Sequence, residues 1–149
     1  MRLKNKFKLP KIIGHRGVKD LSPENSIESI SKAFELDLDC VEIDVKISKD
    51  NIPLLIHDDT LDRTTSGSRL VSNFTFDEIS HLDAGYFFYK SKSTVRVPSL
   101  NKVLEVITNK NKSINIELKP NKGFERLNVD KIVEEIKNFS LEKYILFKL

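Results

Sequence analysis

The sequence has one cysteine and no tryptophan among its 149 residues, and it has no long run of apolar residues. A single cysteine, Cys40, cannot form an internal disulfide, and we expect it to be a small buried residue in a reducing compartment. The longest apolar runs, residues 54–56 and 144–147, are far shorter than the roughly 20 residues that a membrane-spanning helix needs. We therefore expect a cytoplasmic protein that does not insert stably into a membrane.

A strong excess of charge of one sign is also missing. The chain carries 25 basic and 22 acidic residues, for a formal net charge of +3. This charge is too small to indicate a nucleic-acid partner, and the sequence has no basic stripe with interleaved aromatic residues. Residues 1–10 are basic but no apolar segment follows them, so we interpret them as a solvated tail rather than a secretory signal or an anchor on an anionic surface. Residues 11–149 then form one globular domain.

Strand and helix periodicities follow each other along this domain. Strand-like segments, with alternating or short continuous apolar residues, are expected at residues 12–13, 41–47, 52–56, 114–118 and 144–147. Three positions are typical of helix starts: Ser22 followed by proline, the capping box that begins at Thr75, and Ser99. A further helical pattern covers residues 129–139.

This order of elements predicts an α/β fold with a parallel sheet. Polar residues at the strand ends suit a TIM-type (β/α)8 barrel, in which chemistry takes place at the C-terminal ends of the strands. An irregular insertion at about residues 58–98 interrupts the pattern. A complete barrel takes about 250 residues, so we expect only its first half here, in a chain that is cut short. The exposed sheet edges of such a half-barrel favour self-association.

Carboxylates recur at strand spacing. Glu42 and Asp44 lie two residues apart on a predicted strand, so both side chains point to the same face. Glu117 and Lys119 repeat this spacing on a later strand. Three carboxylates in one strand-end layer repel each other unless a cation lies among them, and such oxygen ligands suit Mg²⁺ or Ca²⁺. The alternative is the solvated face of a one-sided sheet, and spacing alone leaves both interpretations open.

Two histidines occupy equivalent positions. His15 and His57 each follow a short apolar run directly, so each is expected at a strand end. Two imidazoles at the same edge can serve as general acid and general base near neutral pH. A lone histidine is more often structural, and we interpret His81, which lies in a helix-like segment without a partner, as a surface residue.

Basic residues lie close to these candidates. Arg16 offers a planar fork of donors that suits phosphate oxygens. Its neighbours Gly14 and Gly17 permit unusual backbone dihedrals and a close approach to a ligand. Lys119 supplies a second cation, although neutralising a carboxylate such as Glu117 explains it nearly as well.

Glu24 and Asn25 have two interpretations. At the start of a predicted helix, their simplest role is a favourable contact with the helix dipole. The more specific interpretation is that they reach the catalytic end of the barrel from the first loop.

Together these residues resemble the glycerophosphodiester phosphodiesterase family. The matching motifs, in chain order, are His15-Arg-Gly17, Pro23-Glu-Asn25, Glu42-Ile-Asp44, His57-Asp58 and Glu117-Leu-Lys119. The insertion adds three more segments that resemble the family, Thr60-Leu-Asp-Arg-Thr-Thr65, Leu82-Asp-Ala-Gly85 and Val97-Pro-Ser-Leu100. The resemblance extends over residues of about 11 to 120.

The resemblance implies a TIM-type barrel with a small insertion after the second strand-end histidine. It also implies metal-dependent hydrolysis of glycerophosphodiesters to glycerol 3-phosphate and an alcohol. The residue roles that it implies are metal binding by Glu42, Asp44 and Glu117, acid/base catalysis by His15 and His57, and phosphate binding by Arg16 and Lys119.

Three alternatives stay open beside this activity. The chain could be a truncated, inactive remnant, or a half-barrel that needs a partner to complete its site. A phospholipase C or D type of phosphodiester chemistry uses similar residues, but the insertion motifs point away from it.

Overall fold

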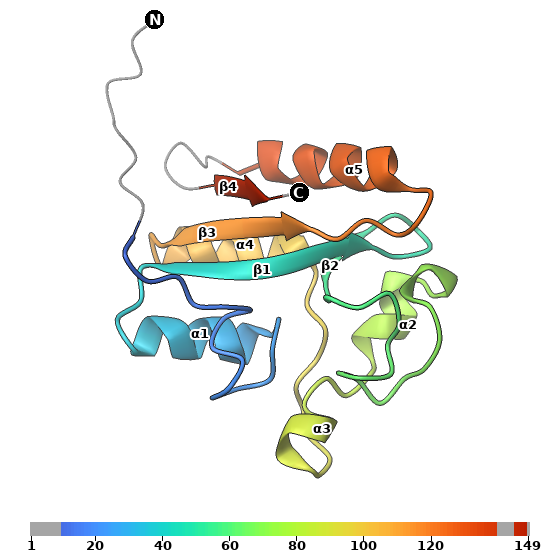
Figure 1. Ribbon diagram of the computed structural model, residues 1–149, viewed down its shortest axis with the longest axis horizontal. Coiled ribbons are helices and arrows are strands. Elements are labelled where there is room, and N and C mark those ends of the chain that lie inside the picture. Colours follow the sequence, from blue (N-terminus) through green and yellow to red (C-terminus); the bar gives the residue numbers. More distant parts are fainter. Residues whose placement is uncertain (1–9, 140–144, 149) are drawn as a thin grey trace, which may run out of the picture.

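A computed structural model of the chain describes residues 10–139 and 145–148. Its strands form one sheet in the order β2-β1-β3-β4, with helices packed around it (Figure 1). The strands are β1 (Cys40–Ile47), β2 (Pro53–Leu55), β3 (Ser113–Leu118) and β4 (Ile145–Lys148). β1 pairs in parallel with β3, and β3 in parallel with β4, which confirms the predicted parallel α/β arrangement for these strands.

The prediction of a parallel sheet is wrong for β2, which pairs antiparallel to β1. Only residues 48–52 connect the two strands, whereas a parallel crossover needs about a dozen residues or more. A tight turn makes the connection. Asn51 adopts a left-handed φ of 64°, and Ser48 Oγ accepts a hydrogen bond from the backbone N–H of Ile52 at 3.0 Å.

The short strand expected at residues 12–13 does not form in the described part of the chain. A single parallel bridge from Gly14 to Val41 stands in its place. Arg16 and Gly17 then adopt left-handed φ values of 51° and 79°. These dihedrals turn the chain away from the sheet before a longer pairing can develop.

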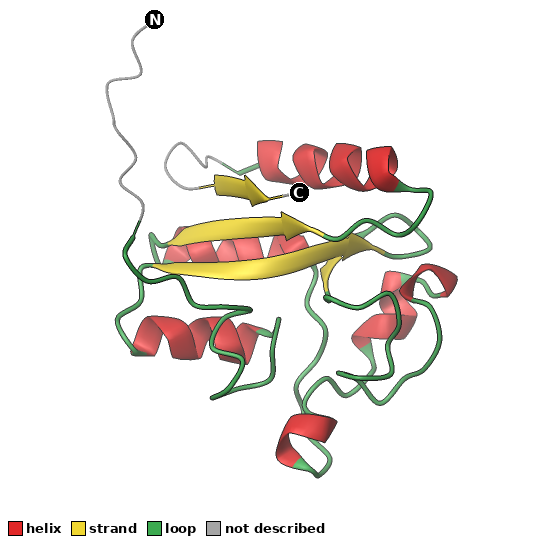
Figure 2. Ribbon diagram, viewed as in Figure 1, coloured by secondary structure: helices red, strands yellow, loops and turns green. Residues whose placement is uncertain are grey.

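Three helices pack on the sheet, and the insertion carries shorter elements of its own (Figure 2). The packing helices are α1 (Ile27–Glu35), α4 (Leu100–Asn109) and α5 (Glu125–Lys137). The insertion contains the 3₁₀ helix η1 (Val71–Asn73), α2 (Phe76–Ser80) and α3 (Tyr86–Tyr89).

Side-chain caps set where the helices begin. The predicted caps at Thr75 and Ser99 are confirmed, and Thr75 forms both hydrogen bonds of a capping box. The cap predicted at Ser22 is wrong, because α1 begins later and Ser26 caps it by accepting from the backbone N–H of the third following residue at 3.0 Å. Asn25 has a left-handed φ of 54°, which excludes a helix that runs through it from Ser22.

One face of the sheet forms the main apolar core. Val41, Ile43 and Val45 of β1 are fully buried there against helix residues such as Ile30 and Leu104. Burial of each such side chain contributes about 1.5–3 kcal/mol. α4 lies behind β1 and β3 in Figure 1, so this face is closed and the opposite face is left for the polar residues of the strands.

The insertion has a smaller core that fastens it to β2. Leu54 and Ile56 pack there with Leu61, Val71 and Ile79, all nearly or fully buried.

None of the helices in the described residues is long and apolar enough to cross a membrane. Residues 1–9 of the expected basic tail, and the first residue of the expected last strand, lie outside the described residues.

Candidate active site

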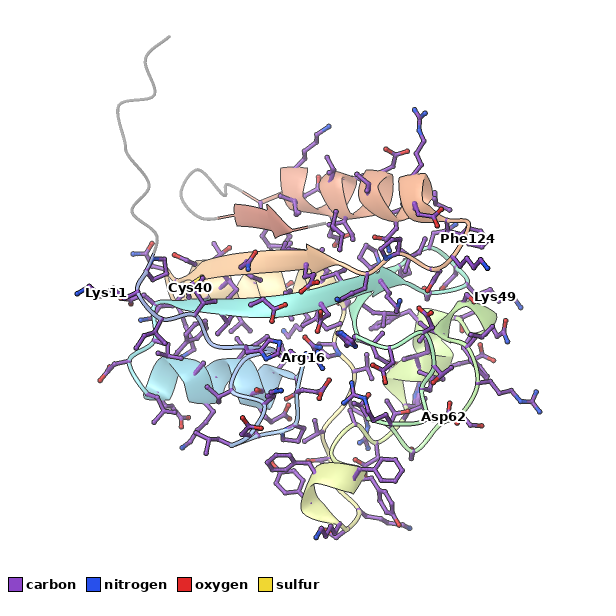
Figure 3. The ribbon with its side chains drawn as sticks, in the orientation of Figure 1. Lys11, Arg16, Cys40, Lys49, Asp62 and Phe124 are labelled. Carbon is purple, nitrogen blue, oxygen red and sulfur yellow. The ribbon has the colours of Figure 1, made fainter. Side chains whose placement is uncertain are left out.

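The polar side chains of β1 are buried rather than solvated. Glu42, Asp44 and Lys46 alternate with the core residues and are 7%, 1% and 2% exposed. Arg16 of the first loop contacts Glu42 and Asp44, and Figure 3 places it next to β1, between α1 and the insertion. The parallel register sets Asp44 beside Glu117 of β3. The alternative of a solvated sheet face is therefore excluded for β1.

The three predicted carboxylates converge. Glu42, Asp44 and Glu117 each offer an oxygen atom, and these atoms lie within 4.8 Å of one another. Oε1 of Glu42 and Oδ1 of Asp44 are buried and accept no hydrogen bond. Burial, together with the charges of Asp44 and Glu117, raises the pKa of Glu42 to about 7. Buried oxygens that lack a donor fit a hard divalent cation, so the residues present suit the metal that the resemblance implies.

Asn25 fixes the position of Asp44. The Asn25 amide donates to Asp44 Oδ2 at 3.0 Å, and its carbonyl oxygen accepts from the backbone N–H of Asp44 at 3.1 Å. Both residues are buried. The backbone of Asn25 is left-handed, with a φ of 54°, so α1 cannot include it. Asp44 Oδ1 is thus left without a hydrogen bond and available to a ligand.

Arg16 connects the first loop to the acidic cluster. Its backbone N–H donates to Glu42 Oε2 at 2.9 Å, and its Nε lies 3.1 Å from Asp44 Oδ2. Its Nη1 donates to Glu24 Oε1 at 2.8 Å. Gly17 adopts the unusual dihedral that the sequence suggested, and a Cβ there would lie 2.4 Å from Ser29 Oγ. The glycine is therefore required for packing against α1.

The two predicted histidines differ in their surroundings. His15 is about half exposed, and its Nε2 lies 3.9 Å from Glu42 Oε2. Partial burial and the charges of Arg16 and Lys19 lower its pKa. His57 is less exposed, and its Nδ1 lies 2.7 Å from Asp58 Oδ1. When neutral His57 carries its proton on Nδ1, Nε2 is the acceptor, as a base requires.

His81 is a surface residue, as predicted. It follows α2, it is exposed, and its Nδ1 lies 2.7 Å from the carbonyl oxygen of Asp77 in the same turn. Substitution of His81 is therefore a suitable control for substitutions of His15 and His57.

Lys119 lies at the end of β3, on the side of the acids. Its Nζ is 2.7 Å from Glu117 Oε1 and 3.9 Å from Asp44 Oδ1. The neutralising role considered from the sequence is therefore observed for Glu117. The ammonium group also stands at the rim of the cluster, where a phosphate oxygen could meet it.

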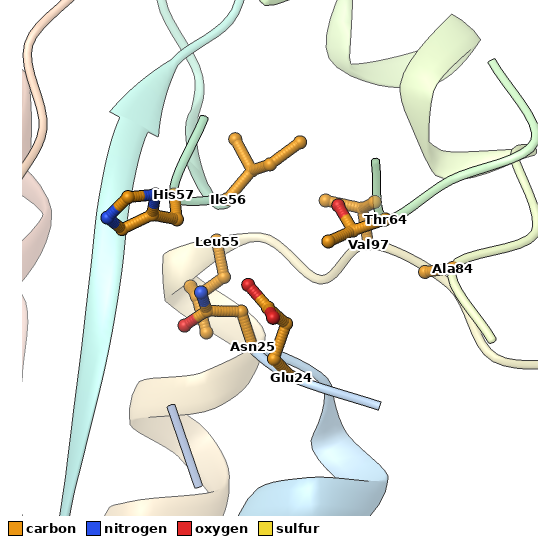
Figure 4. Close-up of a pocket in the computed structure, with 8 residues that line it drawn as sticks. All are labelled: Glu24, Asn25, Leu55, Ile56, His57, Thr64, Ala84 and Val97. Atoms are coloured by element: carbon orange, nitrogen blue, oxygen red, sulfur yellow. The ribbon is translucent and has the colours of Figure 1, made fainter. Parts of the chain in front are cut away.

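A small pocket separates the first loop from the insertion (Figure 4). Glu24 and Asn25 line it from the first loop, His57 follows β2, and Thr64 and Val97 come from the insertion. Of the two interpretations of Glu24 and Asn25, the structure agrees with the one in which they reach the acidic cluster, because Asn25 hydrogen-bonds to Asp44 and Glu24 to Arg16.

The sequence pattern of the glycerophosphoryl diester phosphodiesterase family matches residues 15–144 of this chain. The chain belongs to this family. A glycerophosphodiester phosphodiesterase from Caldanaerobacter subterraneus subsp. tengcongensis is 38% identical over 91% of this chain and 56% of its own length. One from Bacillus altitudinis is 36% identical over 93% of this chain and 57% of its own.

Solved structures agree with the assignment to the glycerophosphoryl diester phosphodiesterase family. A phosphodiesterase from Oleispira antarctica, in complex with the product sn-glycerol-3-phosphate, matches with a TM-score of 0.89 at 36% identity, over 93% of this chain and 57% of that one. A glycerophosphodiester phosphodiesterase from Agrobacterium tumefaciens matches with a TM-score of 0.79. These relatives are TIM barrels, and the open sheet of this chain corresponds to part of such a barrel. The chain spans little more than half the length of the relatives that it matches.

Two basic side chains near the acidic cluster were not predicted from the sequence as site residues: the buried Lys46 and the bridging Arg63. Lys46 donates from Nζ to Asp59 Oδ1 at 2.7 Å and to the carbonyl oxygen of Lys119 at 2.9 Å. Its place two residues after Asp44, on the same strand face, was the signal that could have found it. Arg63 bridges the first loop and the insertion. It lies inside the segment Thr60-Leu-Asp-Arg-Thr-Thr65 that resembles the family, and this was the available signal, although it does not say which carboxylates Arg63 binds.

Proposed function

We propose that this chain carries the metal-binding and acid/base part of a glycerophosphodiester phosphodiesterase site. The reaction is hydrolysis of a glycerophosphodiester to glycerol 3-phosphate and an alcohol. The observation that carries the proposal is the pair of buried oxygens without donors, on Glu42 and Asp44, beside Glu117 and next to a histidine. The named activity of relatives that match most of this chain supports it.

Glu42, Asp44 and Glu117 would hold a divalent cation, Mg²⁺ or Ca²⁺. Bound there, the cation would supply positive charge to the phosphoryl oxygens of the substrate. Asn25 and Arg16 occupy one oxygen of Asp44 and thereby keep the other directed at the cluster. The hydrogen bonds to Glu42 and Asp44 support the proposal, because they fix these two carboxylates without a cation.

His15 and His57 serve in this proposal as the acid/base pair, in which one protonates the departing alkoxide and the other accepts a proton from water. Arg16 and Lys119 hold the phosphate. Both cations already flank Asp44, at 3.1 and 3.9 Å, so their charge is concentrated where the phosphoryl oxygens would need it.

The remaining proposals concern the surroundings of the site. β4 is an outermost strand of the described sheet, and its outer edge could pair with a second copy or with the rest of a barrel. The outer edge of β2 is instead covered by the segment before α4, where the backbone N–H of Leu55 donates to the carbonyl oxygen of Pro98 at 3.1 Å. A cytoplasmic location is consistent with the one cysteine, which is buried and reduced.

The test is release of glycerol 3-phosphate from glycerophosphocholine by the purified chain. Release should require Mg²⁺ or Ca²⁺, stop with a chelator, and be abolished by His15→Ala and by His57→Ala. His81→Ala is the matched control and should leave the rate unchanged, because His81 is exposed and the one hydrogen bond found for it among the described residues is to Asp77 of its own turn. Release that survives both the chelator and His15→Ala would refute the proposal.

A further inference from the structure

Arg63 makes an unusual number of hydrogen bonds for a residue that is half exposed. Its Nε and Nη2 donate to the two oxygens of Asp58 at 2.7 and 3.0 Å. Its Nη1 and Nη2 donate to the two oxygens of Glu24 at 2.9 Å each. One guanidinium group thus binds two carboxylates in the forked geometry that gives strong, directed hydrogen bonds.

The two carboxylates belong to different loops of the site. Glu24 lies on the first loop and also accepts from Arg16 at 2.8 Å. Asp58 lies after β2 and is 2.7 Å from Nδ1 of His57. Arg63 is therefore the one link among the described residues that joins the loop of Arg16 to the loop of His57 through a continuous chain of side-chain hydrogen bonds.

The backbone that carries Arg63 is itself fixed. Leu61 and Thr65, on either side, are each 1% exposed. Both the backbone N–H and the Oγ1 of Thr65 donate to the carbonyl oxygen of Leu61, at 3.1 and 2.8 Å. The exposed guanidinium group thus rests on a buried turn.

Charge supports the same arrangement. Hydrogen bonds from Arg63 hold the pKa of Asp58 well below its usual range. Burial alone would raise the pKa of Glu24, but hydrogen bonds from Arg63 and Arg16 lower it. Both carboxylates are therefore ionised near neutral pH and remain acceptors.

We infer that Arg63 is a positioning residue, which holds Asp58 so that His57 keeps its proton on Nδ1 and presents Nε2 as the acceptor. Through Glu24, the same group steadies Arg16. Only the catalytic consequence rests on the proposed function, and the orientation of His57 does not. Removal of comparable outer partners of site residues lowers activity by about 10- to 100-fold.

Nitrogen-15 NMR of labelled histidine in the 149-residue chain tests the inference without any turnover. The chain has three histidines, so His57→Ala identifies the signal of interest. We expect neutral His57 to be predominantly the Nδ1–H tautomer, and Arg63→Ala to shift it toward a mixture. Arg63→Lys keeps the charge without the fork and should fall between the two.

Arg96→Ala is the matched control, because this arginine also lies in the insertion but donates only to nearby backbone carbonyl groups. An unchanged tautomer in both Arg63 variants, or an equal change in Arg96→Ala, would overturn the inference. If Arg63→Ala does not fold, Arg63→Lys still decides the question.

Enzyme kinetics provides a second test of the inference. Arg63→Ala should lower kcat for glycerophosphocholine about 10- to 100-fold. Adding Arg63→Ala to Asp58→Asn should cost less than Arg63→Ala costs in the wild type, because only the link through Glu24 is left to lose. Fully additive losses would contradict action through Asp58. A tautomer shift together with an inactive wild-type chain would reject the proposed function and leave the inference standing.

Discussion

Replacing Glu42 with glutamine removes a carboxyl group whose pKa is raised by burial, and by the charges of Asp44 and Glu117, from 4.5 to about 7. The folded chain therefore binds this proton more tightly than the unfolded chain does. Between these two pKa values, the metal-free protein loses folding stability as the pH rises, and the full loss is present above pH 7. A shift of this size corresponds to about 3 kcal/mol.

Urea unfolding of the metal-free chain at about pH 5 and about pH 8 measures this difference. Other groups also titrate, so the comparison is between wild type and Glu42→Gln, in which the contribution of about 3 kcal/mol should disappear. Glu35→Gln is the matched control, since this glutamate is 65% exposed on α1. Its pH dependence should follow the wild type.

A divalent cation should reverse the wild-type trend. It binds the deprotonated cluster, so Mg²⁺ or Ca²⁺ at 100 times its Kd should add about 2.7 kcal/mol at pH 8 and much less at pH 5. Equal pH dependence in the wild type and in Glu42→Gln, or a cation effect that Glu42→Gln leaves intact, would refute this reasoning.

Three further substitutions test the local structure by urea unfolding. Asn25→Ala loses both hydrogen bonds to Asp44, so it should lower the free energy of unfolding by about 2–4 kcal/mol and weaken cation binding. Unchanged cation affinity would show that Asn25 does not position Asp44. Gly17→Ala should lower the free energy of unfolding by about 2 kcal/mol or more, because the added Cβ would meet Ser29. Gly123 has a similar φ but no atom within 4 Å of an added Cβ, so Gly123→Ala should show only the backbone cost of about 1 kcal/mol. Equal losses would refute the packing argument. Ser26→Ala should cost about 1 kcal/mol, and a larger loss from Ser22→Ala would contradict the assignment of the cap.

Periodicity in the sequence predicted what depends on one strand or helix alone. The alternation over residues 41–47 specified which face of β1 is apolar and which is polar, and the structure confirms this division, although both faces are buried. The convergence of Glu42, Asp44 and Glu117 followed from the same rule, once two parallel strands were expected to lie side by side.

The features that the sequence did not predict depend on backbone turns and on contacts between distant segments. The direction of β2 is set by a five-residue turn with a left-handed Asn51, and the bridge at Gly14 is ended by the dihedrals of Arg16 and Gly17. Arg63 meets Glu24 across 39 positions of the chain, which no local pattern encodes. Single side chains such as these acquire their roles only when the loops have been placed.

The most direct test of the central claim is glycerol 3-phosphate release from glycerophosphocholine by the metal-stripped chain, before and after Mg²⁺ or Ca²⁺ is added. The wild type should be silent without the cation and active with it, and Asp44→Asn should stay silent in both conditions. A folded wild-type chain that binds the cation and still releases no glycerol 3-phosphate would contradict the proposed function.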